Sequence, residues 1–288
     1  MAVILITGAG GQLGSELRTA SGNYYGYDFI FTDIDTLDIG DKAKTSDFIR
    51  NTNPDWIINC AAYNQVDKAE EDSATADLVN RAAVSHIAEA IRSTECRFIH
   101  FSTDYVFSGM SCQPYNEFSE PGPINAYGMS KLAGEKAALT HHASMIIRTS
   151  WLYSSFGTNF VKTILRKARE NESLNVVFDQ VGTPTYAADL AEAVLAIVSG
   201  VIRNKTTYSP GIYHYSNEGV CSWYDFAEEV VREAGLACRI VPVLSSRYPM
   251  LAQRPSYSVL DKGKIKEKYG LAIPHWRSSM KKCLGLLV

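Results

Sequence analysis

The sequence predicts an α/β protein with a doubly wound parallel sheet and a smaller, interleaved C-terminal lobe. Short β-branched runs alternate with stretches of helical periodicity in the first half, and units of this kind imply a parallel sheet with right-handed crossovers. The runs are almost continuously apolar, as strands buried on both faces must be. In the second half the alternation loosens, and aromatic residues and prolines become frequent between residues 208 and 255.

The expected elements follow in order along the chain. Strands are predicted at 3–7, 29–33, 56–59, 98–102 and 145–149, and helices between them at 13–20, 42–50, 76–92 and 126–139. Later helices are predicted at 159–171, 187–199, 223–234 and 278–287, with short strands at 175–178 and 212–215. We therefore expect a first domain at 1–150, to which later segments return, and a second lobe at 151–288.

Composition excludes several classes of protein. The 288 residues carry 28 Lys+Arg against 31 Asp+Glu, so the chain lacks the basic field of a nucleic-acid or membrane-surface protein. Six cysteines without a CxxC pair predict reduced thiols, a cytoplasmic location and no metal site. The apolar run at 2–6 is too short for a signal peptide, and the run at 190–202 is interrupted by polar residues, so we expect no membrane span.

A glycine-rich loop follows the first predicted strand and leads directly into a helix. Gly8, Gly11 and Gly14 have the spacing GxxGxxG. Glycines here allow a tight turn and a close approach of the backbone to a pyrophosphate, and the helix N-terminus offers free N–H groups to phosphates. The strand before and the helix after the loop favour a dinucleotide site over a plain turn. The first domain is therefore predicted to be an NAD(P)-binding Rossmann-type domain.

An acidic residue stands where the second predicted strand ends. Asp33 lies 33 − 14 = 19 residues after Gly14, where a carboxylate can accept a hydrogen bond from a ribose 2′-hydroxyl. The same carboxylate should repel a 2′-phosphate, which favours NADH over NADPH. Asp35 and Asp38 are alternatives, because strand ends are predicted only to within a few residues. The cofactor is therefore left as NADPH or NADH.

A threonine, a tyrosine and a lysine follow in the order that a carbonyl-reducing site needs. Thr103 follows the fourth predicted strand, and Tyr127 and Lys131 are four residues apart on one face of a helix. A neighbouring ammonium stabilises a phenolate, so it moves the tyrosine pKa from about 10 toward the working range. Beside a nicotinamide, these groups would form a hydride-transfer site. A Tyr–Lys pair at this spacing is also typical of an ordinary helix surface. The evidence that this pair is catalytic therefore comes from the glycine loop and from the strand end at Thr103.

Motifs along nearly the whole chain resemble the dTDP-4-dehydrorhamnose reductase family, within the extended short-chain dehydrogenase/reductase superfamily. They are GQLG at 11–14, NCAAY at 59–63, VDKAE at 66–70, STDYVFSG at 102–109, YGMSKLAGE at 127–135, RTSWLY at 148–153 and RP at 254–255. The STDYVF and RTSWLY runs are more specific than the superfamily motifs.

The resemblance implies NAD(P)H-dependent reduction of the C4 ketone of dTDP-4-dehydro-β-L-rhamnose to dTDP-L-rhamnose, the last step of dTDP-rhamnose biosynthesis. It implies that Tyr127 donates the proton, that Lys131 lowers the pKa of Tyr127 and holds the nicotinamide ribose, and that Thr103 orients the ketone. The cofactor-binding residues, with Gly14 and Asp33 taken from the reasoning above, are then Gly8, Gly11, Gln12, Leu13, Gly14, Asp33, Ala61, Ala62, Tyr63, Tyr127 and Lys131. The substrate-binding residues are Val66, Asp104, Tyr105 and Trp151 for the sugar, and Arg254 for the diphosphate.

The sequence departs from the family pattern at a few positions. Cys60 stands where the family usually has alanine, and Gln253 where a small residue is common before Arg254. Some relatives dimerise around Mg²⁺ held by glutamates. Glu16 matches one such position, but the segment 283–286 has no carboxylate. We therefore expect no metal and leave the oligomeric state open, with a homodimer as one alternative.

Two other functions compete with the reductase. The first is another nucleotide-sugar epimerase, dehydratase or reductase of the same fold. Against a dehydratase, Tyr105 follows Asp104 where a second carboxylate is usual. The second is a non-catalytic NADP-binding regulatory subunit, because fold alone does not determine function.

Overall fold

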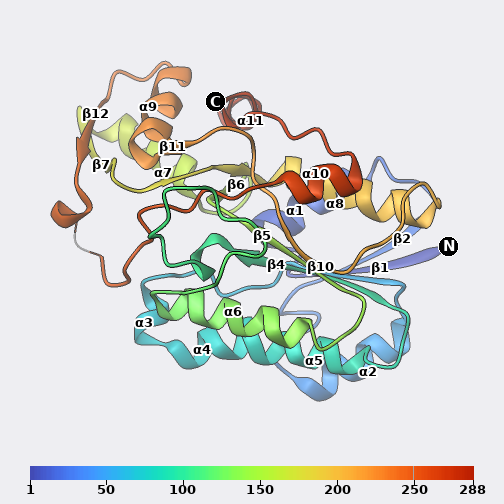
Figure 1. The fold of residues 1–288 in the computed structure, drawn as a ribbon. Coiled ribbons are helices and arrows are strands. Elements are labelled where there is room, and N and C mark those ends of the chain that lie inside the picture. Colours follow the sequence, from blue (N-terminus) through green and yellow to red (C-terminus); the bar gives the residue numbers. More distant parts are fainter. Residues whose placement is uncertain (249) are drawn as a thin grey trace.

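A six-stranded parallel sheet forms the centre of the computed structural model, which describes residues 1–248 and 250–288 (Figure 1). The strand order is β10-β5-β4-β3-β1-β2, and every neighbouring pair is parallel. The strands are β1 (Ala2–Thr7), β2 (Tyr27–Thr32), β3 (Trp56–Asn59), β4 (Arg97–Thr103), β5 (Ser144–Thr149) and β10 (Gly211–His214). The order reverses between β1 and β3, and ligands of such sheets bind at the carboxyl ends of strands beside this point.

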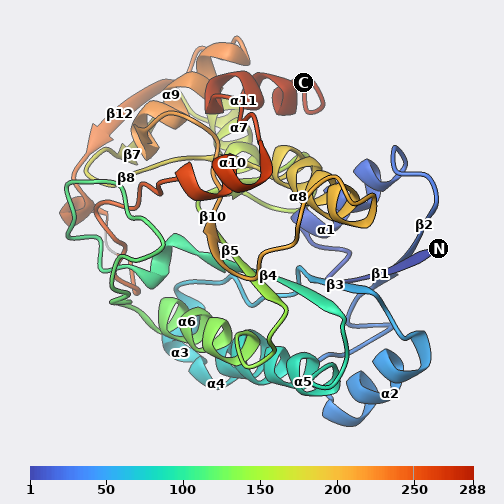
Figure 2. The same cartoon turned by 45° about the vertical axis from the view of Figure 1, so that its right-hand side comes forward.

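Helices cover both faces of the sheet, as the apolar strands require (Figures 1 and 2). One layer contains α2 (Lys42–Thr52), α3 (Lys68–Glu71), α4 (Ser73–Asp77), α5 (Ala83–Ala90) and α6 (Ala126–Ala138). The other contains α1 (Gln12–Ser21), α8 (Ala187–Ile202) and α10 (Gly263–Tyr269). Successive side chains of β1 point to opposite faces of the sheet. Ile4 and Ile6 pack with Leu17 of α1 on one face, whereas Leu5 packs with Ile87 of α5 on the other. The doubly wound α/β prediction is therefore confirmed.

The second half of the chain builds a lobe with its own core beyond one end of the sheet (Figure 2). Its helices are α7 (Phe160–Glu170), α9 (Trp223–Glu233) and α11 (Trp276–Leu284). Three two-stranded ladders join β6 (Leu152–Tyr153) to β9 (Thr185–Tyr186), β7 (Ser173–Val177) to β12 (Arg239–Val243), and β8 (Val181–Gly182) to β11 (Cys221–Ser222). Tyr153, Phe226 and Trp276 are fully buried in this core. Between these segments, α8 and β10 return to the first domain, so the two parts interleave.

Some predicted elements differ from the structure. The single helix expected at 76–92 is broken by a π-helical turn at Leu78–Ala82, between α4 and α5. The last helix begins two residues before the predicted 278 and ends at Leu284. The two-residue ladders and α10 were not predicted, because segments so short carry no readable periodicity. Among the helices that the structure describes, none combines the length and the apolar character that crossing a membrane requires.

Candidate active site

The glycine loop lies at the carboxyl end of β1 and forms one wall of a cavity of about 670 Å³. Gly8 has φ +67°, and a Cβ there would lie 2.6 Å from the Cα of Ala61, so only glycine fits. Gly8, Gly11, Gln12 and Leu13 line the cavity. Gly14 lies beneath it, where a Cβ would come within 2.6 Å of the Ala9 Cα. Gly14 therefore acts by letting α1 pack against the loop.

Asp33 lies beside the glycine loop at the end of β2. Its Oδ2 accepts a hydrogen bond from the N–H of Gly10 at 2.5 Å, and its Oδ1 accepts one from the N–H of Ile34 at 2.7 Å. Asp33 and Asp38 both line the cavity, whereas Asp35 is not part of its wall. Of the three acids considered, Asp33 is thus the one that is held against the loop.

Two buried asparagines, which the sequence analysis missed, hold the turn that follows β3. Asn59 Oδ1 accepts hydrogen bonds from the Ala61 N–H at 3.1 Å and from the Thr7 hydroxyl at 2.7 Å. Asn80 Oδ1 accepts from the Tyr63 N–H at 2.9 Å, and its Nδ2 donates to the Tyr63 carbonyl at 3.0 Å. Ala61, Ala62 and Tyr63 line the cavity. Because Asn80 lies in the π-helical turn, the irregularity in that helix serves the site.

Thr103, Tyr127 and Lys131 all line the same cavity as the glycine loop. Thr103 ends β4, and its hydroxyl donates to Asp104 Oδ1 at 3.1 Å. Tyr127 and Lys131 lie on α6, whose first turn is capped by Asn125: its side chain accepts from the Gly128 N–H at 2.7 Å. The structure therefore brings together the three residues that the sequence singled out as catalytic.

The electrostatics of Tyr127 differ from the sequence-based expectation. Burial raises the pKa of Tyr127 well above its usual 10, and a hydrogen bond with Thr103 opposes the rise only in part. The Lys131 ammonium instead donates to the Phe101 carbonyl at 2.7 Å, and burial lowers the pKa of Lys131 to about 8. The expected lowering of the Tyr127 pKa by Lys131 is thus absent from this arrangement. At neutral pH the Tyr127 hydroxyl keeps its proton, as a proton donor must.

The substrate-binding candidates divide between two cavities. Val66, Asp104, Tyr105 and Trp151 line the main cavity. Arg254 lines a second cavity of about 260 Å³, which shares the side chains of Tyr105 and Trp223 with the first. Arg254 Nη2 donates to Asp67 Oδ2 at 2.7 Å, and its Nη1 donates to Asp67 Oδ1 at 3.1 Å. The guanidinium is thus anchored near the junction of the cavities.

Asp104 is buried beside Thr103, and burial raises its pKa from 3.8 to about 7. Between these two values the folded protein binds more protons than the unfolded chain, so stability falls as pH rises, by up to about 1.4 kcal/mol per pH unit. Below pH ~4 the contribution is fully present, and it is lost as the pH passes ~7. We expect Asp104→Asn to flatten this slope in urea unfolding followed from pH 4 to pH 8. Equal slopes in Asp104→Asn, wild type and the control Asp35→Asn would contradict the prediction.

In the part of the chain that the structure describes, no three His, Cys, Asp or Glu side chains are grouped closely enough to hold a metal ion.

Comparisons with known proteins place this geometry in a family. The model of the RmlD substrate binding domain matches residues 1–288. The chain belongs to this family. It is 40% identical to the spore coat polysaccharide biosynthesis protein SpsK of Bacillus subtilis, over 99% of this chain and 97% of that protein. It is 38% identical to the dTDP-4-dehydrorhamnose reductase of Escherichia coli, over 99% and 97% of the two chains.

Solved structures agree with this assignment. The dTDP-4-dehydrorhamnose reductase of Bacillus anthracis, solved in complex with NADP, superposes with a TM-score of 0.92 at 37% identity, covering 99% of both chains. A UDP-glucose 4-epimerase of Brucella ovis gives 0.80 at 17% identity, over 98% of this chain and 97% of that one, which is a likeness of fold alone. This member of the RmlD family is an oxidoreductase, and the resemblance drawn from its motifs is confirmed.

Proposed function

We propose that the chain reduces the C4 ketone of dTDP-4-dehydro-β-L-rhamnose to dTDP-L-rhamnose, with NADPH or NADH as the hydride source. The observation that carries the proposal is one cavity of about 670 Å³ lined both by the glycine loop and by Thr103, Tyr127 and Lys131. Relatives at 38% and 40% identity named dTDP-4-dehydrorhamnose reductase support the substrate. All six cysteines are free thiols, which supports a location in the reducing cytoplasm.

The glycine-loop side of the cavity fits a dinucleotide. The first N–H groups of α1 lack partners within the helix, as in any helix, and Gly8 and Gly11 leave the backbone open to a pyrophosphate. Asp33 is available to a ribose hydroxyl, and Ile34, Leu37 and Ile39 supply apolar surface for a base at that end. Ala61, Ala62 and Tyr63 would line the rest of the cofactor, up to Lys131.

The chemistry assigns a separate task to each polar group. A reduced nicotinamide, when bound, supplies the hydride to C4 of the ketone. Tyr127 gives its phenolic proton to the ketone oxygen, and solvent later returns a proton to Tyr127. The Thr103 hydroxyl, which donates to Asp104 Oδ1 in this structure, would turn to donate a hydrogen bond to the same oxygen and orient it. Lys131 holds the nicotinamide ribose. The proton moves from Tyr127 to the product alkoxide, a strong base, so a high phenol pKa is compatible with the step.

The second cavity supports a place for the nucleotide half of the substrate. Its wall is mainly apolar, and Arg254 lies at the same wall as Tyr105, which both cavities share. A planar cationic donor suits a diphosphate. The bidentate ion pair with Asp67 would hold the guanidinium in place for that contact.

The test is a turnover assay that follows the absorbance of the reduced nicotinamide. The purified chain receives dTDP-4-dehydro-L-rhamnose generated in situ, with NADPH and NADH in separate samples. Turnover supports the proposal. A folded protein that binds NADPH without turnover of this substrate overturns it. The similarity to SpsK favours a second candidate function, the reduction of another nucleotide ketosugar for a surface polysaccharide. Turnover of such a sugar, without turnover of dTDP-4-dehydro-L-rhamnose, would identify this second function.

Replacing Asp33 is expected to change the choice between the two cofactors. Asp33→Ser removes a carboxylate that repels the 2′-phosphate of NADPH and accepts from the 2′-hydroxyl of NADH. The ratio of kcat/KM for NADPH to that for NADH should rise about tenfold, equivalent to about 1.4 kcal/mol. The variant also loses the contact with Gly10, which affects both cofactors alike, so the ratio isolates the charge effect. Asp35→Ser is the matched control, and an unchanged ratio in Asp33→Ser would refute the assignment.

A further inference from the structure

Two indole rings from separate elements form one wall where the two cavities meet. Trp151 follows β5, and Trp223 is the first residue of α9. Their ring centroids are 3.6 Å apart with an interplanar angle of 7°, and the Phe160 ring packs against Trp223 at 4.5 Å. Trp151 lines the main cavity, whereas Trp223 lines both. The pair therefore presents indole carbon to whatever the cavities hold.

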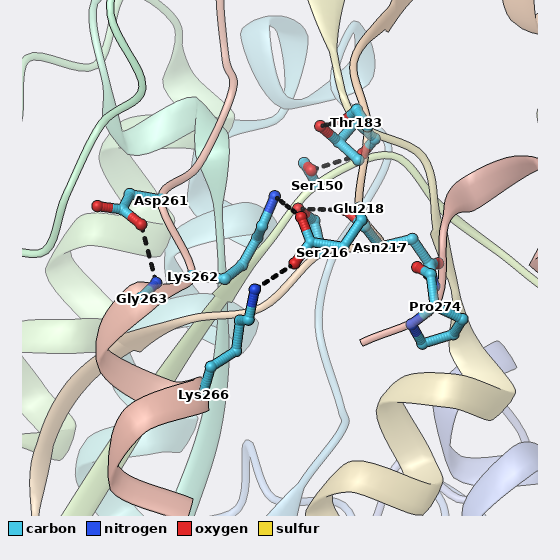
Figure 3. A network of polar contacts seen from close by, with 11 residues as sticks. Ser150, Thr183, Ser216, Asn217, Glu218, Asp261, Lys262, Gly263, Lys266 and Pro274 are labelled. Atoms are coloured by element: carbon cyan, nitrogen blue, oxygen red, sulfur yellow. Dashed lines mark hydrogen bonds and ion pairs between the residues drawn. The ribbon is translucent and has the colours of Figure 1, made fainter. Parts of the chain in front are cut away.

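The backbone of Trp151 is strained to place its ring there. Its φ of +50° lies in the left-handed region, which is rare for a bulky side chain and strains the backbone. Polar contacts on both sides keep it: the Ser150 hydroxyl donates to the Thr183 carbonyl at 2.7 Å (Figure 3), and the Thr185 N–H donates to the Trp151 carbonyl at 3.2 Å. Strain of this kind persists only where the surroundings determine it, and it concentrates at functional sites.

Further contacts connect this backbone to other segments of the fold. The Thr183 hydroxyl donates to the Gly219 carbonyl at 2.8 Å. The neighbouring Glu218 forms ion pairs with Lys266 at 2.8 Å and with Lys262 at 3.4 Å (Figure 3). The segment that carries Trp151 is thereby tied to the start of α10.

Gly182 leaves the space that the Trp151 ring occupies. A Cβ at Gly182 would lie 2.7 Å from Trp151 Cε2 and 2.8 Å from the Ser258 hydroxyl oxygen. Its backbone lies outside the left-handed region, so the fold needs a glycine here for the indole and not for φ. Gly182 also pairs with Cys221, two residues before Trp223. One ladder, β8–β11, thus sets the positions of both rings.

We propose that Trp223 determines sugar specificity, forming with Trp151 a wall that packs against the C5-methyl and C–H face of a 6-deoxy ketosugar, and that Gly182 is a positioning residue for this wall. The inference rests on the proposed function. A hydroxymethyl group at C5 would place its hydroxyl against indole carbon without a partner, which disfavours a 6-hydroxy sugar by about 10- to 100-fold. The wall that the glycine loop forms in the main cavity takes no part in this contact with the sugar.

Steady-state kinetics of Trp223→Phe, Trp223→Ala and Gly182→Ala test the inference. We expect KM for the 6-deoxy substrate to rise at least about tenfold in Trp223→Ala and in Gly182→Ala, and less in Trp223→Phe, while the Kd of NADPH stays unchanged. Gly22→Ala is the control, because a Cβ there meets only an ordinary contact at 3.5 Å. Trp223→Ala should also narrow the preference for 6-deoxy over 6-hydroxy substrate. An unchanged KM in Trp223→Ala overturns the inference.

Fluorescence provides a readout besides turnover. Trp56 and Trp276, the other two tryptophans, are fully buried outside the cavities. Titration with dTDP-L-rhamnose should therefore change the indole emission of the wild type and of Gly22→Ala, and the change should be clearly smaller in Trp223→Phe, where Trp151 is the only indole left in the wall. If the emission of Trp223→Phe changes as much as that of the wild type, the inference is overturned and the proposed function is unaffected. A wild type that neither reduces the ketosugar nor binds its product overturns the proposed function and the inference together. The melting temperature of each variant is compared with that of the wild type. A variant that melts as the wild type does is folded, so that a change in its KM reports a displaced wall.

Discussion

Tyr127→Phe is expected to lower kcat for ketosugar reduction by about 10²–10⁴-fold, the usual contribution of a general acid. The change removes one oxygen, so the proton that Tyr127 would give to the ketone oxygen has no source. The ring itself stays in place, because its packing against Tyr105, at 5.6 Å between centroids, needs only carbon. KM for the substrate and the Kd of NADPH should therefore change little. Stopped-flow and steady-state absorbance of the reduced nicotinamide measure the loss.

The control for this prediction is Tyr25→Phe, which removes the same oxygen from a side chain that is 83% exposed. It should leave kcat unchanged. A Tyr127→Phe protein that retains more than about a tenth of the wild-type kcat would show that another group supplies the proton. A Tyr127→Phe protein that no longer binds NADPH would show instead that the hydroxyl serves the fold of the site.

Glu135→Gln is expected to lower the free energy of unfolding by about 3–5 kcal/mol, because it leaves a buried arginine without a counter-charge. Glu135 on α6 accepts from Arg148 Nε at 2.8 Å and from Nη2 at 2.7 Å, and both side chains are 2% exposed. Arg148 lies on β5 and also faces the Phe107 ring at 5.0 Å. The pair thus joins the helix that carries Tyr127 and Lys131 to the sheet.

Urea unfolding at neutral pH measures this effect, with Glu170→Gln as the matched control. Glu170 forms an ion pair with Arg166 at 3.8 Å on the surface of α7, where the side chains are 59% and 64% exposed. Solvent screens such a pair, so its loss should change stability by about 0–1 kcal/mol. Equal losses in the two variants would contradict the argument that burial makes the difference.

The sequence predicted the elements whose signal is local and repeated. The strand predicted at 56–59 matches β3, whose short apolar run Trp56, Ile57 and Ile58 is fully buried. The glycine loop was recognisable because Gly8 and Gly14 satisfy steric demands that no other residue meets. The catalytic candidates Thr103, Tyr127 and Lys131 followed from strand-end position and helix spacing, and the structure places them at one cavity.

What the sequence missed depends on contacts between distant segments. Nothing local marks Trp223 as a partner of Trp151, 72 residues earlier (223 − 151 = 72), because contacts between distant segments, among them the β8–β11 ladder, bring them together. The π-helical turn at Leu78–Ala82 breaks a pattern that looks continuous, and its reason is the contact between Asn80 and Tyr63. Arg254 stays a predicted diphosphate ligand, but no local pattern indicates its place at a second cavity or its ion pair with Asp67.

The sequence by itself determined the class of fold, the glycine loop and the identity of the catalytic candidates, because side-chain periodicity, glycine sterics and helix spacing act over a few residues. Only the tertiary structure decided the electrostatics and the shape of the site. Whether Lys131 meets Tyr127 or the Phe101 carbonyl, and how far burial raises the Tyr127 pKa, depends on which segments exclude water from these groups. Desolvation is a property of the assembled cavity, and no short stretch of sequence contains it.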